Sequence, residues 1–137
     1  MGDVIKVYSV RSFPKEKPVS LRLYFDSGSP YTFIRKSSTL RFQAVYPLPR
    51  PLGFSGLGEG RFAARELCHM EVRLLGTWCR HTAYVVVDDT LDPRYDVLVG
   101  HDFMQKFNVN LAPRRKDVIL DRDSLRLAQT VRRAAAG

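Results

Sequence analysis

Alternating apolar and polar residues predict that the chain begins with two β-strands. Val4 to Val10 has the pattern of a first strand, and the segment from Ser20 to Asp26 alternates strictly between apolar and more polar positions. Between them, Arg11 to Pro18 contains two prolines and mixed charges, which is typical of a loop. The second strand therefore carries a carboxylate, Asp26, to its far end.

The middle of the chain predicts a meander of further strands. Phe42 to Tyr46 has strand character, and we expect it to end at the alternating prolines Pro47, Pro49 and Pro51, which lack backbone donors. Met70 to Leu74 alternates again and turns at Gly76. Ala83 to Val87 is continuously apolar, which is typical of a strand buried on both faces.

The last third predicts a strand, a short helix and a hairpin. An apolar strand from Asp96 to Val99 is followed by a helical turn from Asp102 to Phe107. Val109 to Leu111 and Val118 to Leu120 are expected to form a terminal hairpin. After it, a helix capped by Asp123 or Ser124 and a disordered tail fit the sequence equally well.

Length and composition indicate one domain with a sizeable core. The chain has 137 residues, 45% of them hydrophobic, and we find no internal repeat. It has no apolar run long enough to span a bilayer and no signal-peptide pattern, so we expect a cytoplasmic protein without a membrane partner. We place the domain at residues 1–122 and a basic helix or tail at residues 123–137.

The net charge of +8 raises nucleic acid as a partner. Much of the excess lies in Arg114-Arg115-Lys116 and in the tail, without interleaved aromatic residues. We therefore expect a solvated basic face and consider nucleic-acid binding unlikely.

The two cysteines do not fit a metal site. Cys68 and Cys79 form no Cys-x-x-Cys pair, and the neighbouring His69 and His81 lack the usual close spacing. Placed on strands around the Gly76 turn, the thiols could face each other, but buried free thiols are the ordinary outcome. We expect no metal and no cofactor.

A carboxylate, a hydroxyl and a glycine follow directly on the second strand, as Asp26-Ser27-Gly28. A charged group at the end of an apolar strand is costly, which marks a candidate functional site. Glycine permits a tight turn and the close approach of another segment. An ordinary Asx turn after a strand explains the same residues equally well.

Three motifs that follow one another along the chain favour a functional site over an ordinary Asx turn. Phe25-Asp26-Ser27-Gly28-Ser29, then Gly56-Leu57-Gly58, then Val97-Leu98-Val99-Gly100-His101-Asp102-Phe103 resemble the motifs of retropepsin-like aspartic proteases. The resemblance covers about Val4 to Asp121. It implies an all-β fold, a closed, barrel-like β meander with a flap hairpin and one short helix, equal to half of a bilobal pepsin-like enzyme.

The resemblance also implies an aspartic endopeptidase that acts on peptides as a homodimer. Asp26 and its symmetry mate would share one proton and activate a water, as paired carboxylates do in such proteases. Ser27 would lock the two loops across the axis, and Gly28 completes the triplet. The side chains expected to bind substrate lie in the flap, Gly56, Leu57 and Gly58, and in the pockets, which Phe33, Leu57 and Leu98 would line.

The sequence departs from the retroviral pattern at an ion pair that supports the dimer. His101-Asp102 stands where retroviral members have Arg-Asn, and Pro30 stands at the position of the arginine's acidic partner. Both partners are therefore missing together, which leaves the strength of the dimer open. A catalytically silent scaffold of the same fold and a protease module of a retroelement polyprotein remain as alternatives.

Two further expectations concern the surroundings of the site. Few residues precede Val4, so we expect the dimer sheet to come mainly from the C-terminal hairpin. A loop rich in aspartates is expected at the rim of the cleft, where it would favour substrates with Lys or Arg; its members are Asp88, Asp89, Asp92 and Asp96.

Overall fold

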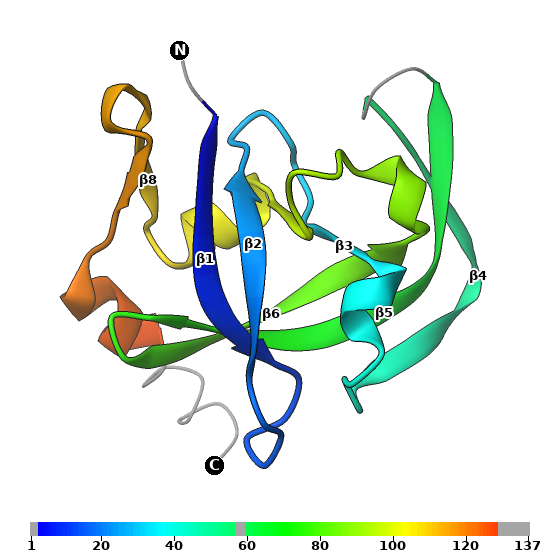
Figure 1. Cartoon of the computed structure of the whole chain (residues 1–137), viewed down its shortest axis with the longest axis horizontal. Coiled ribbons are helices and arrows are strands. Elements are labelled where there is room, and N and C mark those ends of the chain that lie inside the picture. The colour runs from blue at the N-terminus through cyan, green and yellow to red at the C-terminus, as the bar shows by residue number, and fades with distance from the viewer. Residues whose placement is uncertain (1–2, 57–59, 129–137) are drawn as a thin grey trace.

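The computed structural model describes residues 3–56 and 60–128, and strands dominate them (Figure 1). The strands are β1 (Val4–Arg11), β2 (Val19–Phe25), β3 (Phe33–Arg35), β4 (Val45–Ser55), β5 (Arg61–Leu74), β6 (Thr77–Val86), β7 (Val97–Val99), β8 (Asn110–Ala112) and β9 (Asp117–Ile119). The helical elements are α1 (His101–Lys106), short 3-10 turns at Lys36–Thr39, Asp88–Thr90 and Pro113–Arg115, and a helix over residues 122–128.

Six strands close into a barrel. Their order is β1-β2-β7-β3-β6-β5, and β5 pairs again with β1 through Val10 and Val72. The β2–β7 and β3–β6 pairs are parallel, and the other pairs in the barrel are antiparallel. β4 extends the sheet beyond β5 as an edge strand. The predicted all-β, closed, barrel-like fold with a hairpin and one short helix is confirmed.

Strand alternation fills the barrel with apolar side chains. Leu21, Leu23 and Phe25 of β2 are buried and belong to one large core cluster, as the alternation predicts. Phe103 of α1 lies fully buried in the same cluster. Burying each such side chain contributes about 1.5–3 kcal/mol, so this cluster fixes where β2 ends and where Asp26 lies.

The prediction that a strand ends at Pro47 is wrong. β4 runs through Pro47, Pro49 and Pro51 to Ser55, with a register shift between Pro47 and Leu52. An edge strand needs ladder hydrogen bonds on one side only, so prolines are tolerated there and blunt the free edge. The long β4–β5 hairpin that results stands out on one side of the barrel (Figure 1).

The two cysteines lie on β5 and β6 but do not face each other. Cys68 is opposite Ala83, and Cys79 is opposite Val72. Both are buried free thiols, and burial raises the pKa of Cys68 to about 12. Among the described residues, no group of three or more His, Cys, Asp or Glu is arranged to hold a metal ion.

The C-terminal hairpin and helix pack against the barrel. β8 and β9 pair with each other in a separate two-stranded sheet, as predicted. The helix after them is capped by Asp121, whose Oδ1 accepts the Asp123 and Ser124 amides at 3.0 and 3.5 Å, so the predicted cap at Asp123 or Ser124 is wrong. Leu125 of this helix is 1% exposed within the main core.

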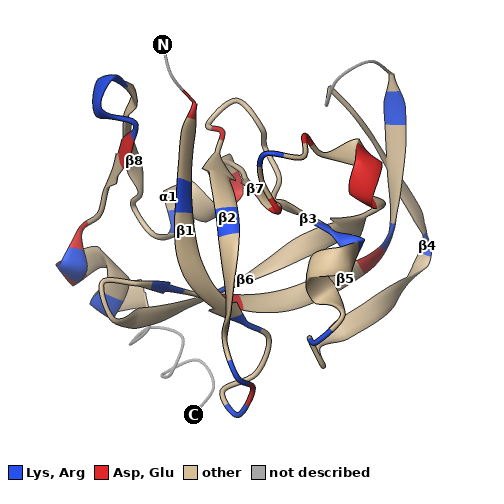
Figure 2. Ribbon diagram, viewed as in Figure 1, with Lys and Arg blue, Asp and Glu red and all other residues tan. Residues whose placement is uncertain are grey.

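The basic run Arg114-Arg115-Lys116 lies at the tip of the β8–β9 hairpin (Figure 2). The hairpin runs beside β1, and Lys6 forms an ion pair with Asp117 at 3.2 Å. No helix among residues 3–56 and 60–128 is long and apolar enough to cross a membrane.

Candidate active site

Asp26 lies where β2 leaves its parallel neighbour β7. Phe25 pairs with Val99, and the Asp26 amide donates a 2.9 Å hydrogen bond to the Val99 carbonyl. The backbone of Asp26 is therefore fixed by the barrel, while the chain after it turns away. The side chain is half-buried, and the following Ser27 and Gly28 are exposed.

The turn after Asp26 orients the carboxylate. Gly28 donates its amide to Asp26 Oδ1 at 3.0 Å, and the Ser29 amide donates to the Asp26 carbonyl at 3.1 Å. The first bond is that of an Asx turn, so the structural alternative predicted from the sequence is present. Within residues 3–56 and 60–128, no other hydrogen bond reaches this carboxylate, which leaves Oδ2 open for chemistry.

Gly100 lets a second segment cross directly behind this turn. A Cβ built on Gly100 would overlap the Tyr31 carbonyl oxygen and lie 2.7 Å from that of Ser29. The Ser29 carbonyl also accepts the His101 amide at 2.6 Å. Any side chain at Gly100 would push the two segments apart, so glycine is required for the close approach.

Two open cavities flank Ser27 on the side of the C-terminal hairpin. One, of about 340 Å³, contains Asp26; its lining is Asp3, Val4, Tyr24, Phe25, Asp26, Ser27, Leu111 and Pro113. The other, of about 350 Å³, is lined by Ser27, His101, Met104, Gln105, Asn108, Val109, Asn110 and Leu111. Ser27 and Leu111 line both, and the Ser27 hydroxyl makes no hydrogen bond to the described residues.

The β4–β5 hairpin brings its aromatic residues onto the residues predicted to line substrate pockets. Phe33 lies with its ring centroid 5.0 Å from that of Phe54 and 5.2 Å from that of Phe62. Phe33 is only 3% exposed, and Leu98, which belongs to the same hydrophobic cluster, is 1% exposed. In this conformation neither is open to a substrate.

At the tip of this hairpin, Gly56 adopts a positive φ of 106°, which favours glycine and supports its predicted place in a turn. The other two predicted flap residues, Leu57 and Gly58, lie outside the described residues.

Two tyrosines beside Asp26 were not identified from the sequence. The rings of Tyr24 and Tyr95 lie 4.8 Å apart, and burial, with a contribution from the charge of Asp26, raises the pKa of both phenols. An ion pair of 3.0 Å between Arg94 and Asp3 lies nearby at the N-terminus of β1. Tyr24 could have been found, because residues two apart on a strand face the same side and Tyr24 precedes Asp26 by two.

Most of the aspartate-rich loop is held in place by hydrogen bonds and ion pairs of its own residues. Asp96 accepts two side-chain hydrogen bonds from Arg22, at 2.9 and 3.2 Å, and lies 3.7 Å from Arg35. Burial raises the pKa of Asp96, but the hydrogen bonds from Arg22 outweigh it and the net shift is downward. Arg35 also donates to the carbonyls of Asp88 and Asp92, each at 2.8 Å, and to that of Tyr95.

No protein-family model matches the sequence, and comparison with curated proteins finds no match. Solved structures do match. The retroviral protease-like domain of Ddi1 from Leishmania major superposes with a TM-score of 0.59 at 15% identity, covering 87% of this chain and 90% of that one. EIAV protease in complex with the inhibitor HBY-793 gives a TM-score of 0.56 at 14% identity, covering 79% and 90%.

The chain has a retroviral protease-like fold. The comparison with the Ddi1 domain covers most of both chains. At these identities the likeness establishes the fold, and activity has to be argued from the residues around Asp26.

Proposed function

We propose that the protein is an aspartic endopeptidase that works as a homodimer. The observation that carries this proposal is the Asp26 carboxylate, which is held by the barrel and by Gly28 yet opens onto a cavity. Asp26 Oδ2 has no hydrogen-bond partner among the described residues, so it is available to a water molecule or a second carboxyl group. The resemblance of Asp26-Ser27-Gly28 to the catalytic triplet of retropepsin-like proteases supports the same assignment.

A second copy is needed because one carboxylate cannot serve both steps of hydrolysis. Removing a proton from water and protonating the departing amine require one ionised and one protonated carboxyl group. In the proposed dimer, Asp26 and the partner subunit's Asp26 share one proton, because two like charges at that distance cannot both ionise. The ionised carboxylate takes a proton from the water as its oxygen attacks the carbonyl carbon. The C–N bond then breaks, the shared proton passes to the nitrogen, and the proton taken from water restores the singly protonated pair.

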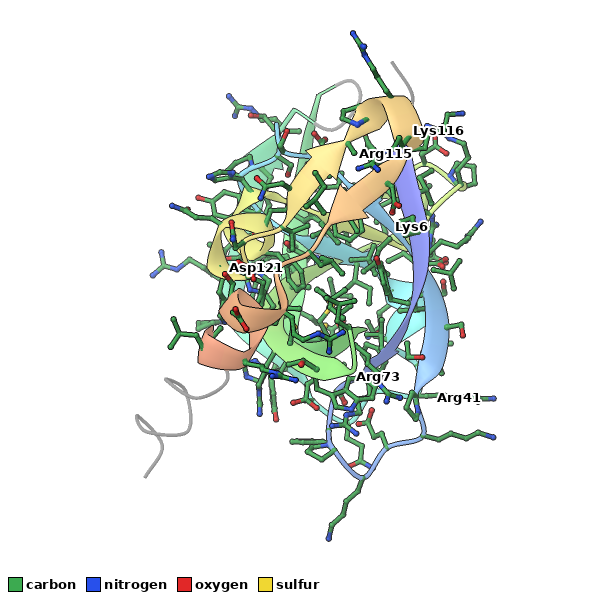
Figure 3. All side chains as sticks on the ribbon, turned by 90° about the vertical axis from the view of Figure 1, so that its left-hand side faces the viewer. Lys6, Arg41, Arg73, Arg115, Lys116 and Asp121 are labelled. Atoms are coloured by element: carbon green, nitrogen blue, oxygen red, sulfur yellow. The ribbon has the colours of Figure 1, made fainter. Side chains whose placement is uncertain are left out.

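The face around Ser27 is the surface that best fits the second copy. Its two cavities are bounded by Leu111, which is only half-buried, and by the exposed Ser27. The β8–β9 hairpin beside them forms its own two-stranded sheet, so its outer edges are free to pair. Figure 3 views the molecule from the side of this hairpin and shows Lys6, Arg115 and Lys116 lying along β1 and the hairpin.

The proposed substrate is an extended peptide with apolar side chains beside the cleaved bond. Phe33 and Leu98 would line its pockets once the β4–β5 hairpin moves, since both are buried now and aromatic rings of that hairpin pack against Phe33. Hairpin movement of this kind is a common gating step in enzymes. The proposal needs neither a metal nor a cofactor.

The test is cleavage of a peptide library by the wild-type protein, Asp26→Asn and Asp123→Asn. Asp26→Asn keeps the volume of the side chain and removes the ionisable group, so cleavage should fall by at least about a thousandfold. Asp123→Asn makes the same chemical change at an exposed position of the C-terminal helix and should cleave as the wild type does. Cleavage by Asp26→Asn at the wild-type rate would refute the proposal.

A further inference from the structure

A buried polar network lies behind the Asp26 turn, and it connects three separate elements. Thr32 donates its hydroxyl to Asp102 Oδ1 at 2.7 Å and accepts the Gly100 amide at 3.1 Å. The other Asp102 oxygen, Oδ2, lies 2.9 Å from His81 Nε2 on β6. The Phe103 amide also donates to Asp102 Oδ1, at 2.8 Å.

Most of the network lies below the protein surface. Thr32 is fully buried, and the side chains of His81 and Asp102 are 11% and 28% exposed. The Phe103 ring and the His81 imidazole meet edge to face, with centroids 5.3 Å apart and an interplanar angle of 88°. An ion pair in such surroundings is screened far less than one on the surface.

The network helps to hold together the two crossing segments, the turn that contains Ser29 and the segment that contains Gly100. The Gly100 amide is buried, and the Thr32 hydroxyl is the acceptor that satisfies it. Thr32 gives its own proton to Asp102, which leaves its lone pairs to accept the Gly100 amide. Protonation of Asp102 would remove the negative charge that strengthens this hydrogen bond, and a proton on Oδ1 would compete with Gly100 for the Thr32 lone pairs.

We propose that His81 is a positioning residue for the Asp26 turn: by donating to Asp102 it keeps that carboxylate an acceptor for Thr32 under acidic conditions. The expected effect on cleavage rests on the function proposed above, whereas the expected effect on the stability of the fold does not.

Asp102 is the charged group that faces His81. On α1, Lys106 instead donates its ammonium to the Arg80 carbonyl at 3.0 Å, and His101 is exposed. On β5, the residue opposite His81 is Met70; next to it, Glu71 pairs with Arg11 at 2.8 Å and His69 lies 3.1 Å from Thr82. Thr32, from the loop before β3, is neutral.

The direction of the effect follows from Asp102. Burial raises the pKa of Asp102, but hydrogen bonds from His81 and Thr32 and the charge of His81 outweigh it, so the net shift is downward. A carboxylate with a lowered folded-state pKa stabilises the fold above its unfolded pKa, and this stability is lost as pH falls through the folded value. Without His81 the loss should begin at a higher pH.

The test compares thermal unfolding of the full chain between about pH 8 and about pH 3 for four variants: His81→Gln, Asp102→Asn, the double variant and His69→Gln. Glutamine can still donate to Asp102 but carries no charge, so the two side chains differ least at about pH 8, where imidazole groups are mostly uncharged. His81→Gln should therefore match the wild-type midpoint within about 2 °C at about pH 8 and fall at least about 4 °C below it at about pH 4, where the charge of His81 acts on Asp102. His69→Gln makes the same change on the neighbouring strand and should show no such acid-dependent loss.

The double variant separates positioning from packing. In the Asp102→Asn background no carboxylate remains to be protonated, so adding His81→Gln should produce no further acid-dependent loss. Parallel profiles for wild type and His81→Gln, or an equal loss in the Asp102→Asn background, would overturn the inference. In cleavage assays His81→Gln should lose at least about fivefold at acid pH relative to neutral pH. A wild type that cleaves nothing would refute the protease proposal and leave the unfolding result standing.

Discussion

The amide of Asp26 donates a 2.9 Å hydrogen bond to the carbonyl of Val99, and this bond joins the end of β2 to the end of β7. Directly after it, each chain segment turns away, one into Asp26-Ser27-Gly28 and the other into Gly100 and α1. The position of the candidate catalytic carboxylate is therefore set by the closure of the barrel. Perturbing either segment should disturb both.

Gly100→Ala should destabilise the protein by about 2 kcal/mol or more, because the added methyl group would meet the carbonyls of Tyr31 and Ser29. Urea unfolding monitored by fluorescence measures the change. Gly53→Ala is the matched control, since a Cβ on Gly53 meets nothing within 4 Å. Equal stabilities of the two variants would show that the segments do not cross as closely as described.

Phe54→Ala should release the β4–β5 hairpin from the cleft, because the Phe54 ring packs against Phe33, Tyr31 and Tyr84 at centroid distances of 5.0, 5.5 and 5.0 Å. Amide hydrogen exchange near Phe62 should become at least about tenfold faster, with exchange in β1 and β2 unchanged. Leu52→Ala, on the same strand at a 38% exposed position, is the control. Unchanged exchange in Phe54→Ala would mean that other contacts hold the hairpin closed.

Leu125→Ala should cost about 2–5 kcal/mol, because Leu125 is 1% exposed and belongs to the main core. Leu127→Ala, in the same helix but 64% exposed, should cost less than about 0.5 kcal/mol. Thermal or urea unfolding distinguishes the two. The domain boundary at residue 122 stays a prediction, and a large loss in Leu125→Ala would argue for including the helix in the domain.

Leu111→Asp should give a folded monomer without protease activity, because Leu111 lines both cavities at the proposed dimer face. A charge there would have to be desolvated on association. Sedimentation velocity across a range of concentrations measures the oligomeric state. Leu40→Asp, at a 76% exposed position after the Lys36–Thr39 turn, should leave the dimer intact. A Leu111→Asp protein that still dimerises and cleaves would place the interface elsewhere.

Local patterns predicted individual strands of the barrel because these strands alternate and their turns are marked by glycine, whereas the closed barrel was implied by the resemblance to retropepsin-like proteases. Leu21, Leu23 and Phe25 are buried as their spacing requires, and the Asp26 turn follows them directly. The predicted strand ended before Pro47, short of the end of β4, because proline is unfavourable in a central strand. The sequence does not show that β4 lies at the edge of the sheet.

The contacts that surround the site were beyond local patterns. His81 and Asp102 are 21 residues apart, and Asp96 meets Arg22 across 74 residues. Such pairs depend on strand order and register, which hydrophobic spacing alone does not determine. Of the predicted substrate-binding residues, Phe33 and Leu98 do lie next to the β4–β5 hairpin, although that hairpin covers them.

Mixing wild-type protein with Asp26→Asn protein tests most directly whether one site needs Asp26 from two chains. Exchange of subunits puts about half of the wild-type chains into mixed dimers when the two proteins are equal in amount, and a mixed dimer has only one Asp26. Cleavage should therefore fall to about half of that shown by the same wild-type protein alone, and further with excess variant. An Asp26→Asn, Leu111→Asp double variant should not inhibit. Cleavage that stays constant as Asp26→Asn is added would contradict a shared site.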